Sequence, residues 1–419
     1  MRKLMVLLLA VGLFCVFATP ATALENIFGG YMRTRAYNNT NFTGEDQTEA
    51  LDFQGVDTRT RLYYTAKFSD AFSFVNKFEF NNTWGDTDGG DIGADATDNL
   101  RVKNSYADFT LGNVNSKIGM QGGVICRGFI MDDDFSGAVF TYKAGDIAIP
   151  FIWAKAYEGY NIGAGTTSRN DFDVDYYGIY PSLKAGGATI KPIFLWMTSK
   201  DARQWTGGGT EDLEKFDIYF FGADVDMNLD ALSLWFTGIY EFGSADGVDP
   251  ADDIDISAYL VALGGEANVG AASVHGQIFY ATGDDDAADG DADAFSIPRG
   301  QSYYWSEIMG YGIFDADASA NSPADGITDI MAINLGVTLK PADKLSLTAD
   351  LWYAALAEDD ANGEDVLGTE VDLKATYKLM DNLNLDVVAA YLFAGDATTG
   401  GSADDADPYE FGTRLSFGF

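Results

Sequence analysis

The stretch Tyr409–Phe419, Y-E-F-G-T-R-L-S-F-G-F, decides the fold that we expect for this chain. Its odd-numbered positions carry Tyr, Phe, Thr, Leu, Phe and Phe, whereas its even-numbered positions carry Glu, Gly, Arg, Ser and Gly. Because alternate side chains of a strand point to opposite faces, one face is aromatic and the other is polar. Such an aromatic face would promote aggregation in a water-soluble edge strand, but a membrane barrel needs it against lipid.

The closing strand resembles that of Gram-negative outer-membrane barrel proteins, whose last strand ends in an aromatic residue that their insertion machinery reads. Here that residue is Phe419. The resemblance implies an all-β fold, a transmembrane antiparallel β-barrel, located in the cell outer membrane. It also implies contact with outer-membrane lipid and lipopolysaccharide.

The start of the chain predicts export. Arg2 and Lys3 precede the apolar run Leu4–Ala18, and Ala21-Thr22-Ala23 fits the small-residue cleavage pattern. We therefore predict a signal peptide at residues 1–23 and a porin-type barrel at residues 24–419. The alternative, a transmembrane anchor, needs a longer apolar run.

Composition excludes several classes of protein. The formal net charge of −38 disfavours nucleic acid as a partner. A disordered chain of that charge would not contain 29 Phe, 22 Tyr and 7 Trp. A single histidine, His275, argues against enzymes that use histidine pairs or a Ser-His-Asp set, so we expect no enzymatic activity. Cys126 is the only cysteine after residue 23, so no disulfide within the mature chain is expected.

Apolar alternation along the chain predicts eighteen strands, with sixteen as the second choice. Long connections follow the odd strands and short turns follow the even ones. This asymmetry is typical of outer-membrane barrels, which have short periplasmic turns and long external loops. The alternation is mixed between Arg101 and Asp108, which predicts a bulge. The segments Leu232–Tyr240 and Ile147–Ala156 are mostly apolar on both faces, which predicts packing under a loop folded into the lumen.

Basic residues recur on the polar faces of several strands. A charge facing lipid costs a few kcal/mol near the bilayer midplane, so these residues should face the lumen. We predict a cationic wall along one sector of the pore, formed by Arg33, Arg35, Arg59, Arg61, Arg101, Arg127 and Arg414. Opposing acidic charge is available in Asp132, Asp133 and Asp134. The alternative is that the arginines pair with carboxylates only to make a charged lumen stable, without selecting solutes.

A second local pattern resembles the general porins. It is the strand Leu100–Asp108 followed by Lys117-Ile118-Gly119-Met120-Gln121, a strand that ends in Gly-x-Gln. The resemblance implies that the connection Ile125–Phe135 is the third external loop, which narrows the channel, and that the protein is a homotrimer. This connection is shorter than the usual constriction loop of the family.

The insertion Gly283–Asp325 carries six aspartates within Gly283–Ala294. We interpret this part as a solvated external loop with no cofactor, and a weak Ca²⁺ or Mg²⁺ site that bridges to lipopolysaccharide is the alternative. The spacing does not fit an EF-hand, because Ala288 falls where a ligand is needed. The segment Tyr303–Met309 is too apolar for a free loop, so we expect it to fold over the mouth or into the lumen as a second constriction.

Our leading hypothesis is a passive diffusion channel for small hydrophilic solutes and ions, filtered by size and by a charged constriction. The alternative is a substrate-specific channel for an organic anion or a saccharide. Two further classes, an enzymatic barrel and a structural anchor, are disfavoured by the single histidine and by the absence of a peptidoglycan-binding domain after the barrel. Preference for cations or anions stays open, because the external loops are acidic and the predicted wall is basic.

Overall fold

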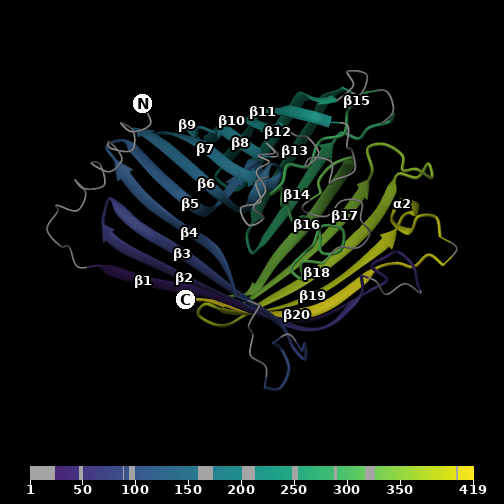
Figure 1. Ribbon diagram of the computed structural model, residues 1–419. Coiled ribbons are helices and arrows are strands. Elements are labelled where there is room, and N and C mark those ends of the chain that lie inside the picture. The colour runs from purple at the N-terminus through teal and green to yellow at the C-terminus, as the bar shows by residue number, and fades with distance from the viewer. Residues whose placement is uncertain are drawn as a thin grey trace.

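The strands of the chain form one twisted sheet (Figure 1). The structure, a computed structural model, describes residues 24–46, 51–87, 89–93, 100–158, 173–200, 213–247, 253–286, 290–316, 326–402 and 404–419. The predicted signal peptide, residues 1–23, lies outside the described residues. Its cleavage therefore stays a prediction.

Strands account for most of the described residues. In chain order they are β1 (Glu25–Thr40), β2 (Phe53–Ser69), β3 (Phe72–Thr83), β4 (Leu100–Leu111), β5 (Val114–Ile125), β6 (Met131–Ala144), β7 (Ile147–Tyr157), β8 (Val174–Ile179), β9 (Leu183–Ala185), β10 (Ala188–Ser199), β11 (Leu213–Leu229), β12 (Leu232–Gly247), β13 (Ile254–Val269), β14 (Ala272–Ala281), β15 (Asp291–Ala292), β16 (Ile330–Ala342), β17 (Leu345–Ala355), β18 (Val366–Met380), β19 (Leu383–Ala394) and β20 (Tyr409–Gly418). The helical elements described are a 3₁₀ turn, η1 (Cys126–Gly128), and α2 (Asp396–Thr399). No helix described here is both long enough and apolar enough to cross a membrane.

The sheet closes on itself. Strand β1 pairs antiparallel with β2 on one side and with β20 on the other, so the first and last strands are neighbours. In the described part of the chain the result is a closed antiparallel barrel of eighteen strands. The predicted fold and strand number are confirmed, and the alternative of sixteen strands is wrong.

Two of the labelled segments, β9 and β15, are not counted as separate strands of the barrel. Strands β8 and β9 are two parts of one barrel strand, interrupted around Pro181, which has no backbone N–H to donate. The backbone N–H groups on either side of the proline still bond to β7, since Tyr180 donates to Pro150 at 3.3 Å and Ser182 donates to Ala148 at 2.9 Å. The short β15 pairs in parallel with the start of β13.

Connection lengths differ between the two ends of the barrel, as predicted. Strands β4 and β5 are joined by Gly112-Asn113, and β18 and β19 by Asp381-Asn382. Gly112 and Asn382 have φ angles of +59° and +65°, the left-handed conformation that tight hairpin turns require. The other end carries the long connections, so the molecule has a short-turn end and a long-loop end.

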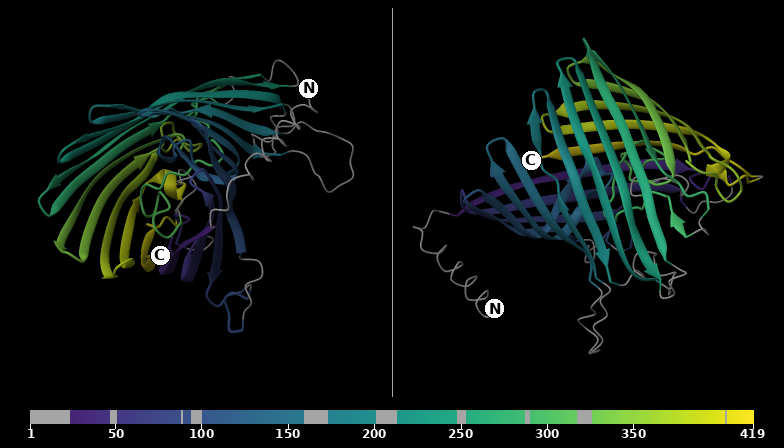
Figure 2. Two further views of the ribbon diagram at one scale, coloured as in Figure 1. Left: turned by 90° about the vertical axis from the view of Figure 1, so that its left-hand side faces the viewer. Right: turned by 90° about the horizontal axis from the view of Figure 1, so that it is seen from above.

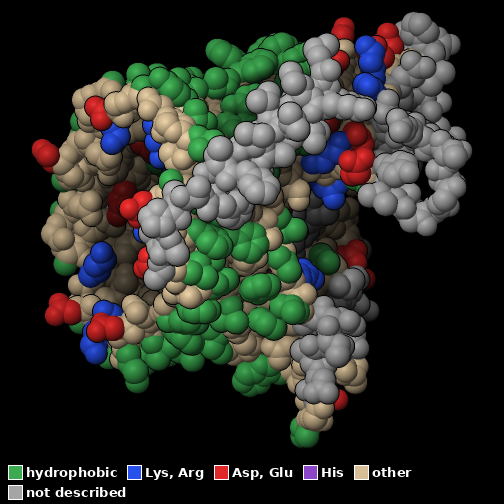
Figure 3. Space-filling model, turned by 60° about the vertical axis from the view of Figure 1, so that its left-hand side comes forward, with side chains coloured by type: hydrophobic (Ala, Val, Ile, Leu, Met, Phe, Trp, Pro, Cys, Tyr) green, Lys and Arg blue, Asp and Glu red, His purple; other side chains and the backbone are tan. Residues whose placement is uncertain are grey.

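The outer face of the barrel is apolar. Along β13, Tyr259, Val261 and Leu263 are 44%, 40% and 51% exposed, while Leu260 between them is fully buried on the lumen side. Figure 3 shows hydrophobic side chains gathered over this outer face, with charged groups toward its margins. An apolar band around a barrel is the surface that a bilayer covers.

The closing strand β20 has the two faces that its sequence predicts. Phe411 is 57% exposed on the outer face. Phe419 exchanges two backbone hydrogen bonds with Gly30 of β1, at 2.9 and 3.1 Å. Its ring also lies against Gly30, where an added Cβ would come within 2.3 Å of Phe419 Cζ. The C-terminal aromatic residue thus closes the seam of the barrel.

The connection between β14 and β16 enters the barrel. We call its described residues 290–316 and 326–329 the inserted segment; residues 317–325 of the predicted insertion lie outside the description. Figure 2 (left) shows this part of the chain, in green, inside the ring of strands. Trp305, Ile308 and Phe314 are nearly or fully buried there, so the prediction that Tyr303–Met309 folds inward is confirmed. The apolar inner residues Ile152 and Ile239 belong to the same buried cluster.

The β5–β6 connection differs from its prediction. The segment Ile125–Phe135 was expected as a loop, but β5 runs to Ile125 and β6 begins at Met131, which leaves five residues. Its polar residues therefore lengthen a strand beyond the apolar band instead of forming a loop. Phe129 and Ile130 are fully buried, and burial raises the pKa of the Cys126 thiol to about 12.

The bulge predicted in β4 is confirmed. The pairing of β3 with β4 shifts register between Lys77, opposite Asn104, and Phe78, opposite Val102. Lys103 is the extra residue of the bulge. The shift allows Lys103 to reach Asp134 of β6, with 2.7 Å between Nζ and the carboxylate oxygen.

Candidate functional site

A group of arginines follows the inner face of the first two strands. Register places Arg33 opposite Arg59 and Arg35 opposite Asp57. On the other side of β1, Arg414 of β20 lies opposite Arg35, as its predicted place in the closed barrel requires. We call Arg33, Arg35 and Arg59 the arginine wall. Arg33 and Arg35 are 7% and 6% exposed, so their charges need partners.

Asp315 of the inserted segment supplies the shared partner of this wall. Its carboxylate binds Arg33 Nη2 and accepts a hydrogen bond from Arg35 Nη1 at 3.0 Å, and Arg59 Nη1 lies 3.6 Å away. Arg35 also donates to the Ile313 carbonyl at 3.2 Å. Burial alone would raise the pKa of the Asp315 carboxyl, but the guanidinium groups, Arg33 first, outweigh it and hold that pKa below its ordinary value of 3.8.

The other predicted basic residues have different partners. Arg61 pairs with Glu79 of β3 at 2.6 Å, and Arg414 pairs with Asp386 of β19 at 2.9 Å. Arg127, in the β5–β6 connection, lies across the lumen from the arginine wall. It pairs with Asp224 of β11 at 2.7 Å and with Asp226, and its guanidinium lies 4.6 Å from the Trp235 ring centre. Arg101 is exposed and forms no ion pair with the residues that the structure describes.

The predicted acidic side needs a correction. Asp132, Asp133 and Asp134 lie in strand β6, opposite Val124, Gly123 and Gly122, and not in a loop that crosses the pore. The ion pair of Asp134 is with Lys103. The prediction that these three carboxylates lie in a constriction loop is therefore wrong, because they belong to a paired strand. The carboxylate that faces the arginine wall is that of Asp315.

Buried carboxylates of β18 hold the inserted segment. Glu370 is fully buried, and its carboxylate accepts hydrogen bonds from the backbone N–H groups of Ile308 at 2.7 Å and Met309 at 2.9 Å, and from the Ser306 hydroxyl at 3.0 Å. Asp372 accepts from the Glu307 N–H at 3.3 Å. Hydrogen bonds to a charged acceptor are stronger than neutral ones, so this contact fixes the backbone of residues 306–309 to the wall.

Gln301 of the inserted segment binds both the β5–β6 connection and Ile327, near the other end of the segment. Its amide donates to the Phe129 carbonyl at 2.9 Å and accepts from the Ile327 N–H at 2.6 Å. The Tyr303 ring stacks on Phe129 with 3.9 Å between centroids, and the Tyr303 hydroxyl donates to Gln277 of β14. The connection predicted as the constriction therefore contributes by supporting the inserted segment.

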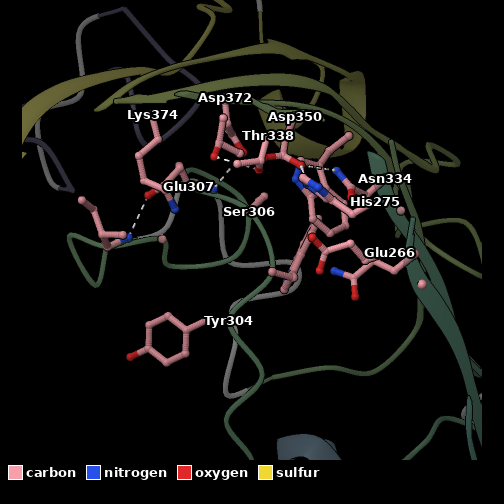
Figure 4. Close-up of a pocket in the computed structure, with 18 of the residues that line it drawn as sticks. Glu266, His275, Tyr304, Ser306, Glu307, Asn334, Thr338, Asp350, Asp372 and Lys374 are labelled. Carbon is pink, nitrogen blue, oxygen red and sulfur yellow. Dashed lines mark hydrogen bonds and ion pairs between the residues drawn. The ribbon is translucent and has the colours of Figure 1, made fainter. Parts of the chain in front are cut away.

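A cavity of about 630 Å³ lies between the inserted segment and the wall formed by β12–β14 and β16–β18. Its lining includes Glu266, His275, Asn334, Asp350 and Lys374. Figure 4 shows Lys374 and Glu266 at opposite sides, with His275, Asn334 and Asp350 between them. His275, the single histidine of the sequence, therefore lines the lumen.

A glycine makes the wall of this cavity possible. His275 Nε2 of β14 lies 2.7 Å from Asp350 Oδ1 of β17, although β16 runs between the two strands. The bridge passes over Gly336 of β16. A Cβ at that position would lie 2.1 Å from the Asp350 oxygen and 2.2 Å from the His275 nitrogen.

We expect Gly336→Ala to break this bridge and to lower the free energy of unfolding by about 1–3 kcal/mol, as overpacking usually does. Gly418→Ala is the matched control in a strand, because the nearest atom to an added Cβ there is the Gly30 oxygen at 3.6 Å. Urea unfolding of the two variants in the same lipid would measure the difference. Equal destabilisation by both substitutions would contradict the steric argument.

The Asp-rich part of the insertion gives no support for a metal site. Among the described residues, no group of three or more His, Cys, Asp or Glu side chains has a geometry that could hold a metal ion. Residues 287–289 lie outside the description, so the predicted alternative of a weak Ca²⁺ or Mg²⁺ site stays untested.

Sequence reasoning missed the residues that organise the lumen. Asp315 lies in a segment without strand alternation, so no pattern relates it to the arginine wall. Glu370 belongs to a strand with alternation, and alternation fixes the face of a residue but not its partners. The sequence did contain one signal for this contact. A carboxylate on the inner face of a strand can bind an apolar insertion that folds into the lumen, as Glu370 does.

Comparison with known proteins gives matches of structure only. No family model and no curated protein matches this chain. Among solved structures, the outer membrane protein OprD from Pseudomonas aeruginosa superposes with a TM-score of 0.58 at 14% identity, covering 96% of this chain and 95% of that one. OccAB4 of Acinetobacter baumannii has a TM-score of 0.58 at 12% identity, covering 96% and 100%. OpdK of P. aeruginosa, in a structure with vanillate, has a TM-score of 0.56 at 12% identity, covering 94% and 98%. The chain therefore has the eighteen-stranded fold of the OprD and Occ outer-membrane porins.

Proposed function

We propose that the mature chain is a passive diffusion channel for small hydrophilic solutes and ions in the outer membrane. The observation that carries this proposal is the contrast between the two faces of a closed barrel. The outer face is apolar, whereas the inner face carries Arg33, Arg35, Arg59 and Arg61 with their carboxylate partners. Charged groups on an inner face are stable where water reaches them.

Size selection is assigned to the inserted segment. It contacts β8 through the hydrogen bond from the Arg299 N–H to the Tyr176 hydroxyl at 2.9 Å, and it contacts β1 through Asp315. These two strands lie on different sides of the ring, so the segment crosses the lumen. Solutes must pass beside it. Charge selection is assigned to the arginine wall and Asp315, which set opposite charges at the edge of the segment. Fixed charges of this kind orient polar solutes and disfavour apolar ones.

Liposome swelling tests solute passage. Vesicles that contain the refolded mature chain should swell in a pentose faster than in a disaccharide, and not in a high-mass dextran. Vesicles with heat-denatured protein give the background rate. Rates equal to that background for every solute would refute the proposal.

A substrate-specific channel is the second candidate, for an organic anion or a saccharide. The cavity of about 630 Å³ favours it, because a general diffusion pore has no need of a pocket beside the constriction. OpdK was crystallised with vanillate, which shows an organic ligand in that protein at 12% identity. Saturable flux of one solute would distinguish this candidate from simple diffusion.

Partners beyond the solute complete the proposal. We propose contact of the long-loop end with lipopolysaccharide, export by a cleaved signal peptide, no catalytic activity, and a homotrimer. Cross-linking of the protein in native membranes tests the last point. A single band at the mass of the monomer would contradict a trimer.

A further inference from the structure

We propose that the cavity beneath the inserted segment is a binding site for a neutral saccharide. The proposal rests on the channel function proposed above and names a solute class for it. The lining residues Thr338 and Thr348 flank the short β16–β17 turn, so the cavity lies on the short-turn side of the inserted segment. A solute that passes the segment would reach it next. Its volume, about 630 Å³, is within the range of about 300–1,000 Å³ that is usual for small-molecule sites.

The floor of the cavity is a prearranged set of hydrogen-bonding groups. Asp350 Oδ1 accepts from Asn334 Nδ2 at 3.0 Å and is bridged to His275, so these three side chains are fixed relative to one another. The hydroxyls of Thr338 and Thr348 lie 3.1 Å apart beside them. Neighbouring donors and acceptors held by a rigid sheet suit a ligand that carries several adjacent hydroxyl groups, because little ordering is needed on binding.

The charges of the cavity disfavour the other small-solute classes. Glu307 and Asp372 are buried, so the ionisable groups that face a solute are Glu266 and Asp350 against His275 and Lys374, two of each sign. An organic anion would compete with Asp350 for His275, and it would also meet Glu266. A cation would compete with His275 for Asp350, and it would also meet Lys374. A ligand without net charge avoids both costs while it uses the same polar groups.

Aromatic side chains also line the cavity. Trp305 of the inserted segment lies against Trp352 of β17, with 5.1 Å between ring centroids, and both line the cavity. Tyr304 is 51% exposed and points into the open side in Figure 4. Aromatic rings present apolar faces next to polar groups, and the C–H faces of a sugar ring pack on such surfaces. An apolar ligand would instead leave the polar floor without partners.

Calorimetric titration of maltose into the full mature chain tests the proposal without any need for conduction. The protein is held in an amine-oxide detergent, which has no sugar headgroup. We expect saturable binding with a dissociation constant on the order of 1 mM. Sodium benzoate at the same concentration should give no binding heat. Binding of benzoate in place of maltose, or no binding of maltose, would overturn the proposal.

The chain offers a matched pair of variants for this titration. Thr338→Val with Thr348→Val removes two hydroxyls from the cavity, and we expect the affinity for maltose to fall about tenfold, because sites built for a hydroxyl group depend on it. Thr34→Val with Thr58→Val removes an equivalent pair, also 3.1 Å apart, on the outer face of β1 and β2. That control should bind maltose as the wild type does. If the cavity variant and the control bind maltose with equal affinity, the proposed binding site is wrong, even if both variants conduct ions.

Discussion

Replacing Glu370 with glutamine is expected to release residues 306–309 from the barrel wall and to raise the single-channel conductance severalfold. Glu370 is fully buried and accepts three hydrogen bonds from the inserted segment, two of them from the N–H groups of Ile308 and Met309. A glutamine of the same shape keeps one acceptor oxygen but turns an NH₂ donor toward those N–H groups. A buried donor that loses its acceptor costs about 1–3 kcal/mol.

This free-energy cost weakens the contact between the inserted segment and β18. It does not weaken the strand pairing of the barrel, because the backbone pairing of β18 with β17 and β19 does not involve the carboxylate. The eighteen-stranded barrel should therefore still form. Glu364→Gln, in the connection before β18, changes the same charge away from these contacts and serves as the control. An unchanged conductance of the Glu370→Gln channel would contradict the role of this contact.

Replacing Asp315 with asparagine is expected to shift ion preference toward anions by about five- to tenfold. The substitution removes the carboxylate shared by Arg33, Arg35 and Arg59, so the arginine wall gains one net positive charge. At an effective dielectric constant of about 20, one charge roughly 10 Å from a passing ion changes its energy by about 1.7 kcal/mol, before screening by salt.

The reversal potential across a potassium chloride gradient measures this shift. Asp381→Asn is the matched control, because Asp381 is 94% exposed at a turn and pairs only with Lys378 among the described residues. The control should keep the wild-type reversal potential. Identical potentials for the Asp315→Asn channel and the wild type would show that the ion path does not pass the arginine wall.

The same carboxylate predicts how the wild-type channel responds to acid. The pKa of Asp315 is held below 3.8, so its charged form is stabilised in the folded protein. The stability that this charged carboxylate gives the folded protein is therefore present above pH 3.8. It is lost, together with the negative charge, as the pH falls through the lowered pKa of Asp315. Reversal potentials should stay constant from neutral pH down to about pH 4 and move toward anion preference below it. The Asp315→Asn channel should lack that acid-dependent change.

Strand alternation predicted most of the barrel. The parity of Arg33, Arg35 and Arg414 placed them on one wall, because the period of a strand fixes the face of every residue once the ends of the sheet meet. The mixed pattern around Lys103 predicted the bulge. The apolar stretch Tyr303–Met309 predicted an inward fold for a chain segment that has no strand pattern of its own.

The partners across the lumen could not be predicted in the same way. Contacts between Asp315 and the arginine wall join residues about 280 positions apart, and no periodicity relates an irregular segment to a strand. The prediction of a loop at the β5–β6 connection failed for a different reason. Asp132–Asp134 extend β6 past the apolar band, where a strand has no hydrophobic alternation and its sequence is that of a loop.

Planar-bilayer recording of the purified mature chain tests the central claim most directly, because it detects a water-filled path through the barrel without assuming a solute. The protein is added to one side of a membrane in potassium chloride under a constant voltage. We predict stepwise increases in current, each of uniform size, that persist while the voltage is held. A membrane that contains folded, inserted barrels and shows no such steps would contradict the account.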